Sequence, residues 1–121
     1  MSILGFTFVG VRTERFHEVR ALYRDVLGMS MIKDQPQAAW FVTPAGDQVH
    51  VYGPDDADHH FFLQGPVVGL RVDDFAATRA AMIAAGIRFI GEPQTASGAI
   101  WNHYYGPDGN VYEITQRPGG A

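Results

Sequence analysis

A histidine and a carboxylate occupy matching places in two similar stretches of the chain. His50 lies six residues after Pro44, and Glu113 lies six residues after Pro107. A histidine and a glutamate that face each other can form an ion pair at neutral pH, or can work as a general acid and a general base. The spacing makes His50 and Glu113 the first candidates for catalysis, with a purely structural pair as the alternative.

The composition limits the other chemistry that the 121-residue chain can support. It contains no cysteine, which excludes disulfides, thiolate metal sites and cysteine nucleophiles. The net charge of −4 and the lack of a basic block argue against a nucleic acid partner. No apolar run approaches the roughly 20 residues of a membrane-spanning helix, and the first residues do not resemble a signal peptide. We expect a cytoplasmic protein that binds a small molecule, without a membrane or nucleic acid partner.

An internal repeat supplies the elements that position the two candidates. The sequence FVGVR at residues 8–12 resembles VVGLR at residues 67–71, and PAGD at residues 44–47 resembles PDGN at residues 107–110. The similar stretches follow in the same order in both halves, which favours a tandem duplication. 

We interpret the chain as a single domain, residues 1–121, with module one over residues 1–53 and module two over residues 66–116. A polar linker over residues 54–65 joins the two modules.

Each half of the repeat predicts a strand, a helix and then three strands. Strand-favouring Val, Ile and Phe fill the predicted strands, and apolar residues recur at helical steps between them. The fold class is therefore α+β, with two tandem βαβββ modules forming a curved mixed sheet around a cleft. We expect strands over residues 3–11, 29–33, 40–43, 48–52, 67–72, 87–90, 100–105 and 110–115. We expect one helix over about residues 14–27 and a second that follows Asp73 or Asp74 and ends at about residue 85.

The two helices have predicted start signals and buried faces. Thr13 can cap the first helix, and Asp73 or Asp74 the second. Gly28 and Gly86 end them. The residues expected to face inward are Phe16, Val19, Leu22, Tyr23 and Val26 in the first helix, and Phe75, Thr78, Met82 and Ala85 in the second.

Four motifs spread over the chain resemble the vicinal oxygen chelate superfamily, which contains glyoxalases, bleomycin-resistance proteins and extradiol dioxygenases. They are LYRDVLGM at residues 22–29, VDDF at 72–75, AAGI at 84–87 and GPDGNVYEI at 106–114. The resemblance implies two βαβββ modules around a funnel, assembled as a homodimer. It also implies a divalent metal ion, held by ligands on the first and last strands of each module.

Carried onto this chain, the resemblance places the last-strand metal ligands at His50 and Glu113 and the first-strand positions at Phe8 and Val67. Neither Phe8 nor Val67 has a donor atom, and Thr7 is the alternative if the first strand is shifted by one residue. A firm metal site needs about three protein ligands. The metal site is thus incomplete, and the sequence predicts no cofactor with certainty. A divalent metal ion is the alternative.

His103 is the candidate for a third ligand. Simple pairing around a four-residue turn puts His103 on the opposite face from Glu113, beside Tyr112. A β-bulge in the glycine-rich turn would reverse this.

Substrate contacts are expected from side chains on the strands of the cleft, namely Phe8, Trp40, Val67, Trp101 and His103. Other aromatic residues lie on the same strands but cannot all face inward, because side chains alternate along a strand. These are Phe6, Phe41 and Tyr104, with Tyr105 and Tyr112 expected mainly to pack.

The remaining histidines and two arginines have simpler interpretations. His17 is expected on a helix surface, and His59 and His60 in a solvated acidic loop. Arg12 and Arg71 end matching strands, where they can be solvated, pair with Asp73 or Asp74, or neutralise an anionic substrate.

Two classes of function follow from the resemblance and the residues together. As an enzyme, the protein is a glyoxalase-like lyase or a dioxygenase-like oxidoreductase, or else a metal-free catalyst in which Glu113 or His50 is the general base. As a binding protein of the bleomycin-resistance type, it sequesters an aromatic or cationic compound without turnover. The negative net charge favours a cationic ligand.

Overall fold

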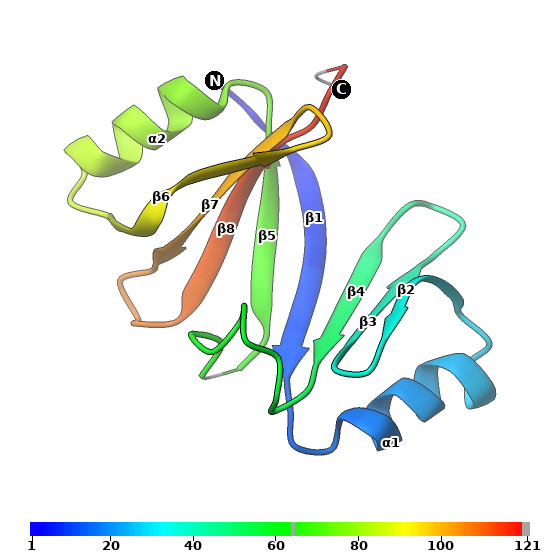
Figure 1. Cartoon of the computed structure of the whole chain (residues 1–121). Coiled ribbons are helices and arrows are strands. Elements are labelled where there is room, and N and C mark those ends of the chain that lie inside the picture. The colour runs from blue at the N-terminus through cyan, green and yellow to red at the C-terminus, as the bar shows by residue number, and fades with distance from the viewer. Residues whose placement is uncertain (64, 120–121) are drawn as a thin grey trace. The chain divides into compact units, whose positions relative to one another are not determined.

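Each half of the repeat folds into a mixed four-stranded sheet with one helix against it (Figure 1). The computed structural model describes residues 1–63 and 65–119. They form two compact units. The N-terminal unit is Phe8–Pro66, and the C-terminal unit is Met1–Thr7 with the described part of Val67–Ala121. The predicted α+β class with βαβββ modules is confirmed.

In the N-terminal unit the strand order is β2-β3-β4-β1, with β1 parallel to β4 and the other neighbours antiparallel. Its elements are β1 Ile3–Arg12, α1 Phe16–Ala21, a π-helical turn η1 Leu22–Val26, β2 Ser30–Gln35, β3 Ala38–Val42 and β4 Gln48–Tyr52. The start of β1 belongs to the other unit.

The first helix differs from its prediction at both ends. It begins at Phe16, and the Thr13 hydroxyl accepts the backbone N–H of Arg15 at 3.0 Å without capping the helix itself. A π-helical turn follows α1 and widens the winding of the chain. The predicted inward positions of Leu22 and Val26 are therefore wrong, since they are 45% and 74% exposed.

A core of fully buried side chains joins α1 to the sheet. The core cluster is Phe16, Ala39, Phe41 and Val51, with Val19, Tyr23 and Met31 packed against it. The ring of Tyr23 meets that of Phe41 edge-on at 5.5 Å. Since alternate residues of a strand share a face, the odd-numbered residues of β3 and β4 face the helix and the even-numbered ones face away.

In the C-terminal unit the strand order is β5-β8-β7-β6, with β5 parallel to β8. Its elements are β5 Val67–Val72, α2 Phe75–Ala84, β6 Arg88–Ala96, β7 Ala99–Tyr105 and β8 Val111–Gln116.

The helix of this unit, α2, is capped by a side chain, as predicted. Asp74 is the N-cap, and its carboxylate accepts the backbone N–H of Ala77 at 3.0 Å. The helix ends before Gly86, whose φ of +90° suits glycine. The predicted inward position of Ala85 is wrong, because Ala85 lies at the helix end and is exposed.

The C-terminal core lies between α2 and the sheet. It consists of Val72, Phe75, Tyr104 and Ile114, with Leu70, Met82 and Tyr112 among the residues packed against it. Even-numbered residues of β7 and β8 therefore face α2. His103, Glu113 and Thr115 lie on the face of the sheet away from the helix.

No helix within residues 1–63 and 65–119 is long and apolar enough to cross a membrane.

Candidate functional site

The turn between β7 and β8 sets which side chains meet across the two strands. The backbone N–H of Gly109 donates to the carbonyl of Gly106, and the N–H of Gly106 donates to the carbonyl of Asn110, each at 2.9 Å. Gly109 has a φ of +82°. This is a three-residue loop with a glycine in the left-handed region, which adds one residue to the simple turn. The strands consequently pair His103 directly with Glu113.

His103, Glu113 and Thr115 form a polar network on the helix-free face of the C-terminal unit. The His103 Nε2 lies 2.9 Å from the Glu113 Oε2, and the Thr115 hydroxyl donates to the Glu113 Oε1 at 2.5 Å. The side chains of His103 and Glu113 are only 13% and 10% exposed. Of the two predicted alternatives, simple pairing beside Tyr112 is therefore wrong, and the structure has the irregular turn that brings His103 to the face of Glu113.

The N-terminal unit carries a different set of residues at the equivalent positions. Its hairpin turn has the same hydrogen bonds, between Thr43 and Gly46 and between Thr43 and Asp47, so Trp40 pairs with His50 across β3 and β4. In the repeat, Trp40 corresponds to His103, and His50 to Glu113. One unit thus has a tryptophan and a histidine where the other has a histidine and a carboxylate.

His50 lies inside a stack of three rings from β1, β4 and β3. Its imidazole is parallel to the ring of Phe8 at 4.4 Å and to that of Trp40 at 4.0 Å. The Lys33 ammonium lies 3.9 Å from the centre of the Trp40 ring, where a cation is attracted by the π-electrons. Both faces of the imidazole are covered, and His50 is 6% exposed.

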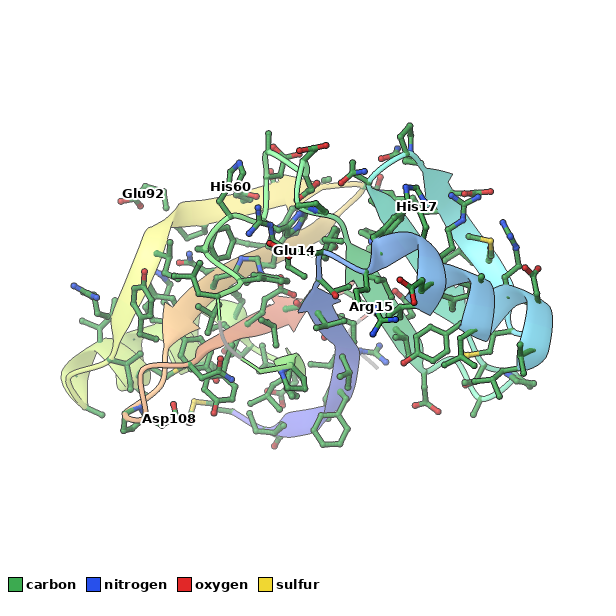
Figure 2. The ribbon with its side chains drawn as sticks, turned by 90° about the horizontal axis from the view of Figure 1, so that it is seen from below. Glu14, Arg15, His17, His60, Glu92 and Asp108 are labelled. Carbon is green, nitrogen blue, oxygen red and sulfur yellow. The ribbon has the colours of Figure 1, made fainter. Side chains whose placement is uncertain are left out.

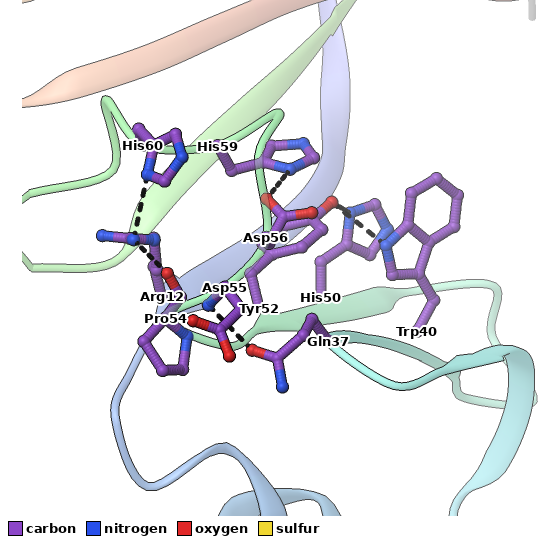
Figure 3. Close-up of polar contacts among 10 residues, drawn as sticks. All are labelled: Arg12, Gln37, Trp40, His50, Tyr52, Pro54, Asp55, Asp56, His59 and His60. Atoms are coloured by element: carbon purple, nitrogen blue, oxygen red, sulfur yellow. Dashed lines mark hydrogen bonds and ion pairs between the residues drawn. The ribbon is translucent and has the colours of Figure 1, made fainter.

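Polar side chains lie within hydrogen-bond distance of both nitrogens of His50. Figure 3 shows His50 beside the hydrogen bond between Trp40 and Tyr52. The Gln48 Oε1 lies 2.9 Å from the His50 Nε2, and the Tyr52 hydroxyl lies 3.3 Å from the Nδ1. The Trp40 indole donates to that hydroxyl at 3.0 Å. These contacts hold the imidazole in one orientation.

The donor atoms do not fit the divalent metal ion that the family resemblance implies. Phe8 and Val67 offer no lone pair, and the nitrogens of His50 are bonded to Gln48 and Tyr52. Glu113 keeps lone pairs on its oxygens, but one carboxylate is too few ligands for a firm site. Within the described part of the chain, no group of three or more His, Cys, Asp or Glu side chains is arranged to hold a metal ion.

Residues of the linker contact the N-terminal unit, whereas the sequence predicts a solvated loop (Figure 3). The His59 ring stacks on Tyr52 at 3.7 Å, and its Nδ1 lies 2.7 Å from the Asp56 carboxylate. The prediction for His59 is therefore wrong, because the aromatic surface of β4 attracts the ring. His60 is exposed, and its Nδ1 lies 3.0 Å from the guanidinium of Arg12.

Arg12 also donates to the carbonyl of Pro54 at 2.7 Å. It thus ties the start of the linker to the end of β1, in place of the predicted pairing with Asp73 or Asp74. 

Other predicted positions fall on both faces of the sheets. Val67 is fully buried, Trp101 is half-buried, and the buried Thr7 hydroxyl has no hydrogen-bond partner among the described residues. Phe41 and Tyr104 pack on the helix side in the two cores. Phe6 is 68% exposed, and His17 is exposed on α1 as predicted (Figure 2).

A second carboxylate takes part in a hydrogen bond at the β7–β8 turn (Figure 2 labels Asp108). The Tyr112 hydroxyl donates to Asp108 at 2.7 Å, and the backbone N–H of Asn110 donates at 3.1 Å. The bond from Tyr112, followed by that from Asn110, lowers the pKa of Asp108. The same bond raises the pKa of Tyr112. This contact stabilises the turn that sets the strand register.

Thr115, Tyr52 and Lys33 take part in these contacts but do not stand out in the sequence. The repeat contains a signal for the first two. Tyr52 and Thr115 lie two residues after His50 and Glu113, and alternation puts each on the same face as its partner. Lys33 has no such signal, because its contact with Trp40 depends on the bulge between Met31 and Lys33 in β2.

Comparisons with known proteins agree with this architecture. A family model described as Glyoxalase/Bleomycin resistance protein/Dioxygenase superfamily matches residues 5–114. A Mn(II)-bound glyoxalase from Novosphingobium aromaticivorans is 23% identical with a TM-score of 0.73, over 94% of this chain and 39% of that chain. A methylmalonyl-CoA epimerase from Mycobacterium tuberculosis is 19% identical with a TM-score of 0.72, over 95% and 89%.

A methylmalonyl-CoA epimerase from Streptomyces coelicolor is 15% identical with a TM-score of 0.72, over 98% of this chain and 100% of that chain. At these identities the structural likenesses show the fold alone. No curated protein matches the sequence.

Proposed function

Because the chain belongs to the Glyoxalase/Bleomycin resistance protein/Dioxygenase superfamily, we propose that it binds a small organic molecule and moves a proton on it with its own side chains rather than with a bound metal ion. The observation that carries this proposal is the contact between His103 and Glu113, 2.9 Å apart and largely covered. A carboxylate fixed by a neighbouring histidine is equipped for acid–base catalysis.

The geometry supports Glu113 as the base and its neighbours as positioning residues. The Thr115 hydroxyl donates to one carboxylate oxygen, and the His103 ring meets the other. The carboxylate is therefore held in one orientation, with lone pairs left on both oxygens for a proton from the substrate. Gly69 pairs with Glu113 on β5, so no side chain from that position crowds the carboxylate.

The substrate class follows from the residues beside this network. Arg71 and Trp101 both pair with Thr115, from the neighbouring strands, and alternation places them on the same helix-free face. No hydrogen bond or ion pair joins Arg71 to another residue of the described ranges. An unpaired guanidinium binds a carboxylate well. We infer a small carboxylic acid with a carbon-bound proton next to a carbonyl group.

The proposed step is a reversible proton transfer. The C–H bond next to the carbonyl breaks, its electron pair moves into the enolate, and the proton passes to a Glu113 oxygen. Return of the proton to the same carbon or to the enolate oxygen gives an epimer or an enol. No oxidant or metal ion takes part in this step.

Hydrogen–deuterium exchange tests the proposal without knowledge of the product. Pyruvate, 2-oxobutyrate and 3-methyl-2-oxobutyrate are incubated with the protein in D₂O containing a chelator, and loss of the C3 proton signal is followed by NMR. We expect exchange that persists with the chelator and falls about 100-fold or more in Glu113→Gln, the usual contribution of a general base. Glu92→Gln, on exposed β6, is the matched control (Figure 2).

Two results would contradict the proposal. One is no exchange above the protein-free rate with any of the three acids. The other is equal exchange in Glu113→Gln and in the wild type.

Binding without turnover is the second candidate, and the ring stack around His50 favours it. The position equivalent to Glu113 is closed between Phe8 and Trp40, so the N-terminal unit has no exposed acid or base there. A ligand that quenches tryptophan fluorescence saturably, with no exchange and no product, would favour this candidate.

A further inference from the structure

A pocket lies on the helix side of the C-terminal unit, on the opposite face of its sheet from His103 and Glu113. Its volume is about 310 Å³, which is within the range of small-molecule sites. Its walls come from α2 and the segment that follows it, from β5, β7 and β8, and from the N-terminal residues Met1, Ser2 and Ile3. Figure 1 shows the N-terminus beside α2.

Small side chains on α2 and just after it leave this space open. Ala81 on the helix and Ala85 at its C-terminal cap are exposed and line the pocket, and Leu70, Ile87 and Ile114 form apolar walls. Hydrogen bonds fix the chain at its mouth, where the backbone N–H of Ser2 donates to Asp73 at 2.6 Å and the N–H of Asp73 donates to the Ser2 carbonyl at 3.2 Å. The space is therefore framed by elements held in place.

Tyr104 gives this pocket a polar group that the fold itself does not use. The residue is 7% exposed and lines the pocket, and its hydroxyl makes no hydrogen bond with any residue in the described parts of the chain. A tyrosine hydroxyl that bonds to no other side chain can donate to the oxygen of a molecule in the pocket. Burial also raises the pKa of Tyr104, so the hydroxyl keeps its proton and can donate.

The other half of the repeat shows what this position looks like without a pocket. Phe41 corresponds to Tyr104, at the same distance from the hairpin turn. It is fully buried, and Tyr23 covers its ring from the helix side. Where the C-terminal unit has a tyrosine that lines a pocket, the N-terminal unit thus has a fully buried phenylalanine without a hydroxyl.

A second hollow continues from the first. It has a volume of about 520 Å³ and shares Leu70 and Tyr104 with the pocket. Tyr112 and Asp108, from the β7–β8 turn and the strand after it, also line this hollow. An elongated molecule can therefore extend past Tyr104 toward the β7–β8 turn.

We propose that this helix-side pocket is a second ligand site, which takes an apolar molecule carrying a carbonyl or ether oxygen that accepts a hydrogen bond from the Tyr104 hydroxyl. The site does not depend on the proposed proton transfer, since the two lie on opposite faces of the sheet.

A pair of probes that differ only in the oxygen tests the site. Acetophenone has an apolar ring and a carbonyl acceptor, and ethylbenzene has nearly the same shape without the oxygen. Each is titrated into ¹⁵N-labelled protein, and amide shifts are followed. We expect saturable shifts around Leu70, Ala81 and Ile87 for both, with acetophenone binding roughly 2- to 12-fold more tightly, the ratio that one neutral hydrogen bond gives.

Three variants make the test specific. Tyr104→Phe should reduce acetophenone affinity to that of ethylbenzene and leave ethylbenzene unchanged. Ala81→Phe should fill the pocket and abolish binding of both, while Ala80→Phe, on the same helix but outside the pocket, should bind like the wild type. Unchanged far-ultraviolet circular dichroism shows that each variant is folded.

Several outcomes would overturn the proposal. They are no saturable shifts up to the solubility of the probes, shifts centred on His103 and Glu113 instead, equal affinities for the two probes, or binding that survives Ala81→Phe. If Tyr104→Phe does not fold, the comparison of the two probes in the wild type and in Ala81→Phe still decides.

Discussion

Replacing the two members of the His103–Glu113 pair, singly and together, should reveal a coupling in the free energy of unfolding. The atoms lie 2.9 Å apart, and the side chains are 13% and 10% exposed, so water screens the interaction weakly. Hydrogen bonds to a charged group contribute about 1.5–3 kcal/mol. We therefore expect the costs of Glu113→Gln and His103→Leu to exceed the cost of the double variant by about that amount.

The assay is urea unfolding at pH 7, followed by circular dichroism and fitted for each of the four proteins in the cycle. His103→Gln is the matched control, because its side-chain amide keeps an N–H donor near the carboxylate. It should recover part of the loss seen with leucine. Costs that add to within about 0.5 kcal/mol would show that the two side chains do not interact and would refute the geometry on which the proposed function rests.

Three local contacts give further predictions. Tyr112→Phe should raise the pKa of Asp108 toward its ordinary value in an NMR titration, and an unchanged pKa would contradict the role of the hydroxyl. Since folding lowers this pKa, the stabilisation from Asp108 is present above its ordinary pKa and is lost as the pH falls through the lowered value. Asp74→Ala should cost about 1 kcal/mol in urea unfolding by removing the α2 cap, unless Ala77 finds another acceptor. Gly109→Ala should cost about 1–2 kcal/mol at a φ of +82°, and a neutral effect would mean that the turn relaxes.

Hydrophobic pattern and repetition were sufficient to predict the architecture. The strands expected over residues 48–52 and 67–72 have those bounds in the structure, because alternating or continuous apolar residues are bounded by turn residues on both sides. The helix α2 was predicted to within a residue at each end, since Asp74 and Gly86 are strong boundary signals. 

The face on which His103 lies could not be predicted from a simple four-residue turn, which encloses a two-residue loop. The observed loop has one residue more, with Gly109 in the left-handed region, so that Gly106 pairs with Asn110. A shift of one residue in register moves every side chain of a strand to the other face. A single turn thus decides whether His103 meets Glu113.

The first helix was mispredicted because its apolar spacing assumes a regular α-helix throughout. The chain winds more widely after Ala21, and Leu22 and Val26 turn away from the core. Nothing in the residue types of this segment distinguishes a π-helical turn from a continued α-helix. The stack around His50 was missed for a related reason. Trp40 meets His50, and Lys33 meets Trp40, only through the register of β2, β3 and β4.

Metal content is the most direct test of the central claim. The claim is that the residues at the family's metal-ligand positions hold no metal ion, and that Glu113 instead accepts a proton from the substrate. The protein is purified without chelator, dialysed against an excess of Mn²⁺, passed through a desalting column and analysed for metals. We expect well below one metal ion per chain, with no difference between the wild type and Glu113→Gln. One tightly held ion per chain in the wild type, lost in Glu113→Gln, would contradict the account.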